Sequence, residues 1–178
     1  GSSPISLDKV SFSDLSVRYG DDRSNLAITT HSKTLALTGR FSEALNELTL
    51  SGDAHLLSWM DDTTVVLADR MAHLRLALEF GGPDALFRIT RGEVNTGDVP
   101  LEVTVTVTEG PNGDELDLRA NGLGMDLADA INLLPENMTR DLARYTMNGE
   151  VDLAIHYAGP IGGDGPSLSV GATVFKAN

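Results

Sequence analysis

The sequence contains no cysteine and few aromatic residues. Without cysteine the chain can form neither disulfide bonds nor cysteine-ligated zinc sites, and thiol catalysis is excluded. Aromatic residues make up 5% of the chain and hydrophobic residues as a group 41%, so leucine, valine and isoleucine must provide most of the packing. The missing cysteines leave the compartment open, because proteins of oxidising compartments can also lack them.

Positive charge and long hydrophobic runs are also scarce. Lysine and arginine number 13 against 26 aspartate and glutamate residues, which gives a formal net charge of −13. This negative charge repels nucleic-acid backbones and anionic membrane surfaces, so we expect no nucleic-acid partner. No apolar run approaches the roughly 18–20 residues that cross a bilayer as a helix, and no basic segment followed by an apolar stretch opens the chain.

The length of 178 residues is sufficient for one well-buried core. We expect a single β-rich domain over residues 4–178, preceded at residues 1–3 by Gly-Ser-Ser, which is typical of a cloning scar. The chain stops directly after a strand-like run, so we interpret it as a segment of a longer protein.

Apolar and polar residues alternate in about ten runs, which is the pattern of strands with one apolar and one polar face. Turns rich in glycine, proline and aspartate separate the runs at intervals of about 8–12 residues, which predicts an antiparallel meander. A phase change between Phe12 and Leu15 predicts a β-bulge. The three clearest apolar rows are Leu74, Leu76, Leu78 and Phe80; Leu101, Val103, Val105 and Val107; and Val151, Leu153, Ile155 and Tyr157. Weaker runs include Leu26/Ile28 and Leu35/Leu37.

One region, residues 126–145, has a helical period instead. Four apolar residues fall at i, i+3, i+4 and i+7 after Asp126, a suitable N-cap, and Pro135 ends this helix and suits the first turn of a second. Helices this short are marginal alone, so we predict that both lie on the apolar face of the sheet and cap one end of it. The predicted cap residues are Ile131, Leu134, Leu142 and Tyr145.

Residues that could support catalysis or metal binding form no recognisable motif. The four histidines lack the i, i+4 spacing of zinc ligands, and we interpret His73 and His156 as solvated residues on the polar sides of their strands. Acidic pairs such as Asp21-Asp22 lack the calcium-loop pattern and are interpreted as polar turns. Ser58 lacks the G-x-S-x-G elbow, and no P-loop or dinucleotide-binding motif is present. We therefore expect no enzyme activity, no cofactor and no metal site.

The apolar strand surface leaves two alternatives for the architecture. In a sandwich, two apolar faces close on each other; in one long curled sheet, an apolar trough must be filled by helices, a partner or acyl chains. Two short helices are little cover for about ten strands, and an apolar strip beyond a few hundred Å² usually marks a binding surface.

The last third of the chain carries a resemblance to a known family. Its elements are LDLRANG at residues 116–122, a short helical segment closing in LLPE at 133–136, and GEVDLAIHYAGPI at 149–161. This order resembles that of the AsmA-like family of bacterial envelope proteins, relatives of TamB and of the eukaryotic bridge-like lipid-transfer proteins. The upstream part of the chain has a similar succession of strand-like runs and turns.

The resemblance implies a mainly β (α+β) fold, in which a long curled antiparallel meander forms a taco-like groove. It also implies a periplasmic segment of an inner-membrane-anchored protein, without catalytic residues, that takes part in phospholipid transport and outer-membrane homeostasis. The partner would be a phospholipid or another acyl-chain ligand, and the three apolar rows given above would line the groove. The alternative is a non-catalytic structural domain of the cell envelope that recruits other envelope proteins by strand addition. A glycan-binding domain has less support, because the chain has few aromatic residues for stacking on sugars.

Overall fold

The computed structural model describes residues 5–21, 26–61, 64–82, 85–111, 113–133, 139, 147–161 and 167–175. In these ranges nine strands form one antiparallel sheet, and they lie in the sheet in their order along the chain. The strands are β1 (Ile5–Asp21), β2 (Leu26–Phe41), β3 (Asn46–Asp61), β4 (Thr64–Gly82), β5 (Ala85–Thr96), β6 (Val99–Gly110), β7 (Gly113–Asp126), β8 (Glu150–Pro160) and β9 (Ser167–Phe175). The predicted mainly β class and meander topology are confirmed.

The number of strands differs from the prediction for a local reason. The runs Leu26/Ile28 and Leu35/Leu37 were expected to be separate strands, but both belong to β2. The pairing of β2 with β3 shifts between His31 and Leu35, and this irregularity interrupts the alternation without ending the strand. The described part of the chain therefore contributes nine strands to the sheet in place of about ten.

The bulge predicted between Phe12 and Leu15 is wrong in position. Pairing of β1 with β2 continues through this stretch and shifts instead between Leu7 and Val10. At Asp14 the backbone has a φ of 52°, in the left-handed region. The phase change in the sequence thus corresponds to a backbone distortion and not to an inserted residue.

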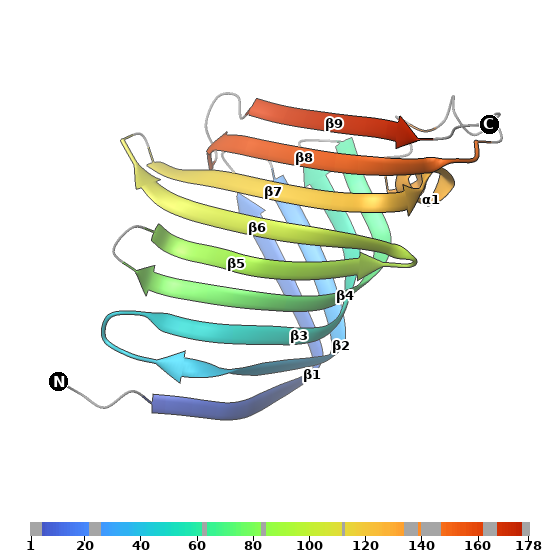
Figure 1. Ribbon diagram of the computed structural model, residues 1–178. Coiled ribbons are helices and arrows are strands. Elements are labelled where there is room, and N and C mark those ends of the chain that lie inside the picture. Colours follow the sequence, from blue (N-terminus) through green and yellow to red (C-terminus); the bar gives the residue numbers. More distant parts are fainter. Residues whose placement is uncertain are drawn as a thin grey trace.

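The sheet curls strongly along its long strands. Figure 1 shows that β1–β4 turn near their middle and that their far halves rise behind β5–β9. The sheet is a single layer that bends round, so the curled alternative holds and the two-sheet sandwich does not. Short turns keep neighbouring strands in register; for example, Gly97, with a φ of 61°, and Asp98 form the two-residue loop between β5 and β6.

The helix α1 (Leu127–Asn132) follows β7 directly. Asp126 is its N-cap, as predicted: the Asp126 carboxylate accepts hydrogen bonds from the backbone N–H groups of Ala128 at 2.8 Å and Asp129 at 3.4 Å. The second predicted helix lies outside the described residues, except for its residue Thr139. The predicted cap residues Leu134, Leu142 and Tyr145 also lie outside them.

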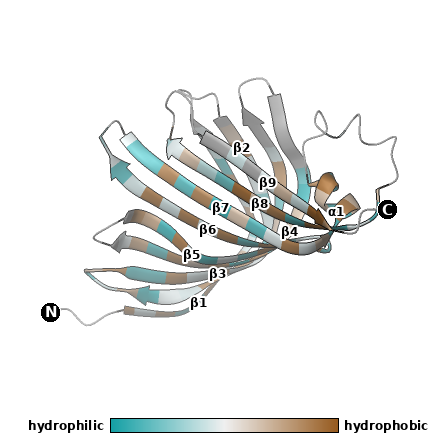
Figure 2. Ribbon diagram, turned by 45° about the horizontal axis from the view of Figure 1, so that its top comes forward, coloured by the Kyte–Doolittle hydropathy of each residue, from teal (hydrophilic) through white to brown (hydrophobic). Residues whose placement is uncertain are grey.

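The most buried cluster lies where α1 meets the sheet. Figure 2 shows the apolar helix beside the ends of β7 and β8. Ala130 of α1 is buried, and Ile131, the described member of the predicted cap, is half-buried. The cluster consists of Val99, Met125, Ala130, Val151 and Leu153, with Leu101, Leu127, Leu133 and Ile155 packed against it. The helix therefore lies on the apolar face, at one end of the strands.

Candidate functional site

The apolar side chains of successive strands lie in register on one face of the sheet. Residues directly opposite each other in an antiparallel ladder point to the same side. One such row joins Leu37, Leu50, Leu76, Gly92, Val103, Ala120 and Ile155, from β2 to β8. We call the surface made by this row and its parallel neighbours the apolar face.

All twelve residues predicted to line the groove belong to this apolar face. Leu78 pairs with Ile89, Ile89 with Val105, Val105 with Leu118 and Leu118 with Tyr157. The remaining predicted residues join the same face through equivalent rows: Phe80 and Val107 through Phe87, Leu74 and Leu101 through Val94, Val103 and Leu76 through Gly92, Ile155 through Ala120, Leu153 through Gly122, and Val151 through Met125.

A β-bulge in β5 is required for this alignment. Leu78 pairs with Ile89, whereas the preceding residue Ala77 pairs with Arg91, so one extra residue of β5 is left between them. Without it, Ile89 and Gly92, three positions apart, would point to opposite faces. The bulge therefore keeps the apolar face continuous between β4 and β6.

The apolar face is only partly covered in the described part of the chain. Of the predicted lining residues, Val105, Val151 and Leu153 are buried, and the others are half-buried. Among the described residues, no large side chain is fully buried. A sheet closed into a dry interior would contain many such side chains, so this face retains contact with solvent along much of its length.

The two ends of the apolar face differ. At one end α1 covers Met125, Val151 and Leu153. Toward the opposite ends of the strands, Phe80 of β4 and Phe87 of β5 form an aromatic pair with ring centroids 4.9 Å apart and an interplanar angle of 47°. A helix thus marks one end and two rings mark the other.

The opposite face of the sheet is polar and carries ion pairs between strands. His73 lies 2.9 Å from Asp53, and His156 lies 3.0 Å from Asp117, so both histidines are on the polar side as predicted. Arg119 also contacts Asp117, at 3.1 Å, and the hydrogen bonds from Arg119 and His156 lower the pKa of Asp117. Within the described ranges, no cluster of histidine and acidic residues could hold a metal ion.

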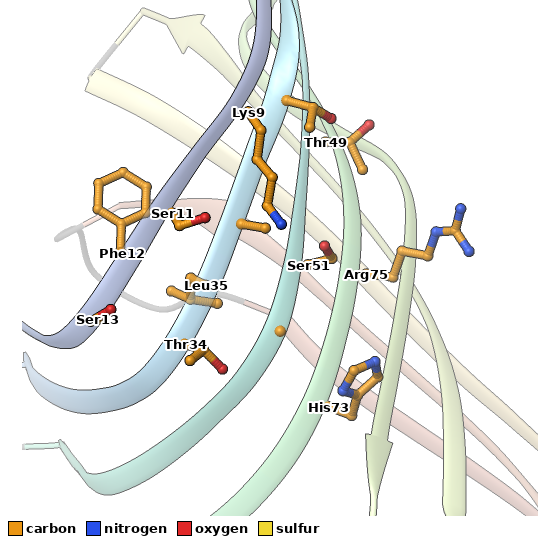
Figure 3. Close-up of a pocket in the computed structure, with 13 residues that line it drawn as sticks. Lys9, Ser11, Phe12, Ser13, Thr34, Leu35, Thr49, Ser51, His73 and Arg75 are labelled. Carbon is orange, nitrogen blue, oxygen red and sulfur yellow. The ribbon is translucent and has the colours of Figure 1, made fainter.

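A hollow of about 660 Å³ lies on the polar face of β1–β4. Figure 3 shows Lys9, Ser51 and Arg75 on the same side of the strands. In the part of the chain that the structure describes, neither Lys9 nor Arg75 forms an ion pair. The sequence pattern missed this hollow, because its polar residues come from distant parts of the chain. Its cations and hydroxyl groups suit a polar ligand and not an acyl chain.

No described helix is long and apolar enough to cross a membrane. Comparisons of the chain with protein-family models, with curated proteins and with solved structures found no match.

Proposed function

We propose that this chain is an AsmA-like envelope segment that binds the acyl chains of phospholipids along its apolar face. In this proposal the segment belongs to an inner-membrane-anchored protein of the periplasm, it is not an enzyme, and it contributes to phospholipid transport and outer-membrane homeostasis. The observation that carries the proposal is the continuous apolar face of a curled, single-layer sheet whose lining is mostly half-buried.

The size of the apolar face supports this function. From Val99 to Val107, β6 spans about 27 Å at 3.4 Å per residue, and the row from β2 to β8 spans about 29 Å at 4.8 Å between strands. The product, roughly 800 Å² before curvature, is the footprint of the face, and α1 covers one end of it. Such a surface can hold an extended hydrocarbon chain.

The energetics of transfer also favour an acyl ligand. Each methylene group moved from water to an apolar surface contributes roughly 0.8 kcal/mol, so about ten methylenes contribute up to roughly 8 kcal/mol. The ligand loses translational and conformational freedom, which reduces this value. The remainder is compatible with a carrier that both binds and releases its ligand.

A matched pair of variants tests the proposal. Val103 and Thr104 are neighbours on β6 but point to the apolar and polar faces, respectively. Native mass spectrometry of protein purified under mild conditions should detect acyl lipids on the wild type and on Thr104→Asp, and much less on Val103→Asp. Circular dichroism of both variants checks that the sheet is formed. Equal lipid retention by the two variants, or none by the wild type, would contradict the proposal.

The open edges of the sheet favour a second candidate function. The strand order begins with β1 and ends with β9, so each of these strands has one described neighbour in the sheet. Val17 and Tyr19 of β1 and Phe175 of β9 are among the exposed large hydrophobic residues. An unpaired edge can accept a strand from another envelope protein. Replacing Val17 with proline should abolish such pairing while acyl-lipid retention persists.

A further inference from the structure

Arg70 is a charged residue within the inward-facing row of β4. The β3–β4 ladder pairs Arg70 with Leu56, Leu74 with Gly52 and Leu76 with Leu50. Arg70 is therefore on the same face as the apolar row that continues through Ala72, Leu74, Leu76, Leu78 and Phe80. In this row, from residue 70 to residue 80, it is the one side chain that carries a charge.

Among the described residues, most of the guanidinium group of Arg70 has no hydrogen-bond partner. Its Nη2 atom donates a hydrogen bond of 2.6 Å to the backbone carbonyl of Asn132, the last residue of α1. Its Nε atom is buried and has no hydrogen-bond partner. No described carboxylate forms an ion pair with Arg70. The side chain thus reaches from the far half of β4 to the helix on the apolar face, and no carboxylate among the described residues neutralises its charge.

An anion bound beside Arg70 would stabilise this arrangement. A buried donor without an acceptor is destabilising, and a guanidinium group in apolar surroundings is stabilised by an opposite charge. Arginine presents its N–H groups as a planar fork that matches the oxygens of phosphate and carboxylate groups. The neighbouring apolar face suits the hydrocarbon part of the same ligand.

The geometry points to Arg70 as the residue that binds the phosphate of an acyl lipid, with the head group at the α1 end and the acyl chains along the apolar face. This inference rests on the proposed function and adds to it the charge and the orientation of the ligand. A bound phosphate would supply the counter-charge for a cation that lies inside the curl of a protein with a net charge of −13.

Lipids with identical acyl chains test the inference. Phosphatidic acid and diacylglycerol differ in the phosphate, and glycerol phosphate supplies the phosphate without acyl chains. We expect the wild type to bind phosphatidic acid about ten-fold more tightly than diacylglycerol, the effect of roughly one charge-assisted hydrogen bond. Arg70→Gln should lose this preference and bind diacylglycerol as the wild type does, and Arg70→Lys should retain part of it.

Arg75→Gln is the matched control, because it removes the same charge from the polar face of the same strand and should keep the preference. A preference for phosphatidic acid that persists in Arg70→Gln would overturn the inference. Equally weaker binding of both lipids by Arg70→Gln would also overturn it, because that result would indicate that Arg70 only supports α1. Glycerol phosphate binding as tightly as phosphatidic acid would also overturn it, because the site would then take free phosphate. Failure of the wild type to bind either lipid would instead refute the proposed function itself, and the inference with it.

Discussion

The imidazole Nε2 of His156 lies 3.0 Å from the carboxylate of Asp117, across the ladder between β7 and β8. Arg119, two residues along β7, contacts the same carboxylate at 3.1 Å. The two donors stabilise the ionised form of Asp117, so its pKa falls below the usual value of 3.8. This three-residue cluster joins two strands on the polar face.

The stability that Asp117 provides should depend on pH. Because its pKa is lower in the folded than in the unfolded protein, the contribution is fully present above pH 3.8 and is lost as the pH falls through the lowered value. Thermal unfolding of wild type and Asp117→Asn, measured from pH 5 to pH 2, should show a difference in Tm that shrinks toward the acid end. Asp114→Asn, at an exposed position near the start of β7, is the control. A difference that grows on acidification would contradict this assignment.

Packing beneath α1 predicts unequal effects for two leucines. Leu153 belongs to the buried cluster and is 8% exposed, whereas Leu123 is 74% exposed. Leu153→Ala removes buried methyl groups and leaves a cavity, so it should lower the free energy of unfolding by about 2–5 kcal/mol. Leu123→Ala should change it by less than about 0.5 kcal/mol. Urea unfolding followed by circular dichroism measures both values, and similar losses would show that α1 does not cover a packed core.

The alternation of residues was sufficient to predict the face of the sheet but not its long-range contacts, and the curl was implied only by the family resemblance. Alternation has a local cause, since neighbouring side chains of a strand point to opposite sides, and it identified residues of the apolar face from Leu74 to Tyr157. Asp126 was also identified correctly, because capping depends on residues two and three positions away. Strand number was less certain, since an irregularity within β2 resembles a turn.

Contacts between distant residues could not be predicted in this way. His156 and Asp117 are 39 positions apart, and Arg70 and Asn132 are 62 apart. Their proximity follows from the register of several ladders and from the curl of β4, and neither feature is encoded in a short stretch. Arg70 therefore resembled an ordinary polar residue of a strand, although it lies on the apolar face.

The N-cap of α1 should contribute measurably to stability. The Asp126 carboxylate accepts two backbone hydrogen bonds at the start of the helix, and the helix covers the buried cluster. Asp126→Ala should therefore lower the free energy of unfolding by about 1 kcal/mol. Asp126→Asn retains an oxygen acceptor and should stay within a few tenths of a kcal/mol of the wild type. Equal destabilisation by the two substitutions would indicate that charge, and not capping, is what matters at this position.

Gly92 provides the sharpest test of how closely the strands approach each other on the apolar face. A Cβ atom added there would lie 2.8 Å from the carbonyl oxygen of Val103 and 3.1 Å from Cδ2 of Leu76. The carbonyl belongs to the neighbouring strand, so relief requires a shift of β6. Gly92→Ala should destabilise the protein by about 1–3 kcal/mol, the usual effect of overpacking.

Gly20 of β1 is the matched control for this substitution, because an added Cβ would meet no atom within 4 Å. Gly20→Ala should leave the unfolding midpoint in urea nearly unchanged. A glycine-to-alanine change also restricts the unfolded chain equally at both sites, so the difference between the two variants isolates the close contact with Val103. If Gly92→Ala were as stable as Gly20→Ala, β5 and β6 would have to be further apart than the pairing of Gly92 with Val103 allows.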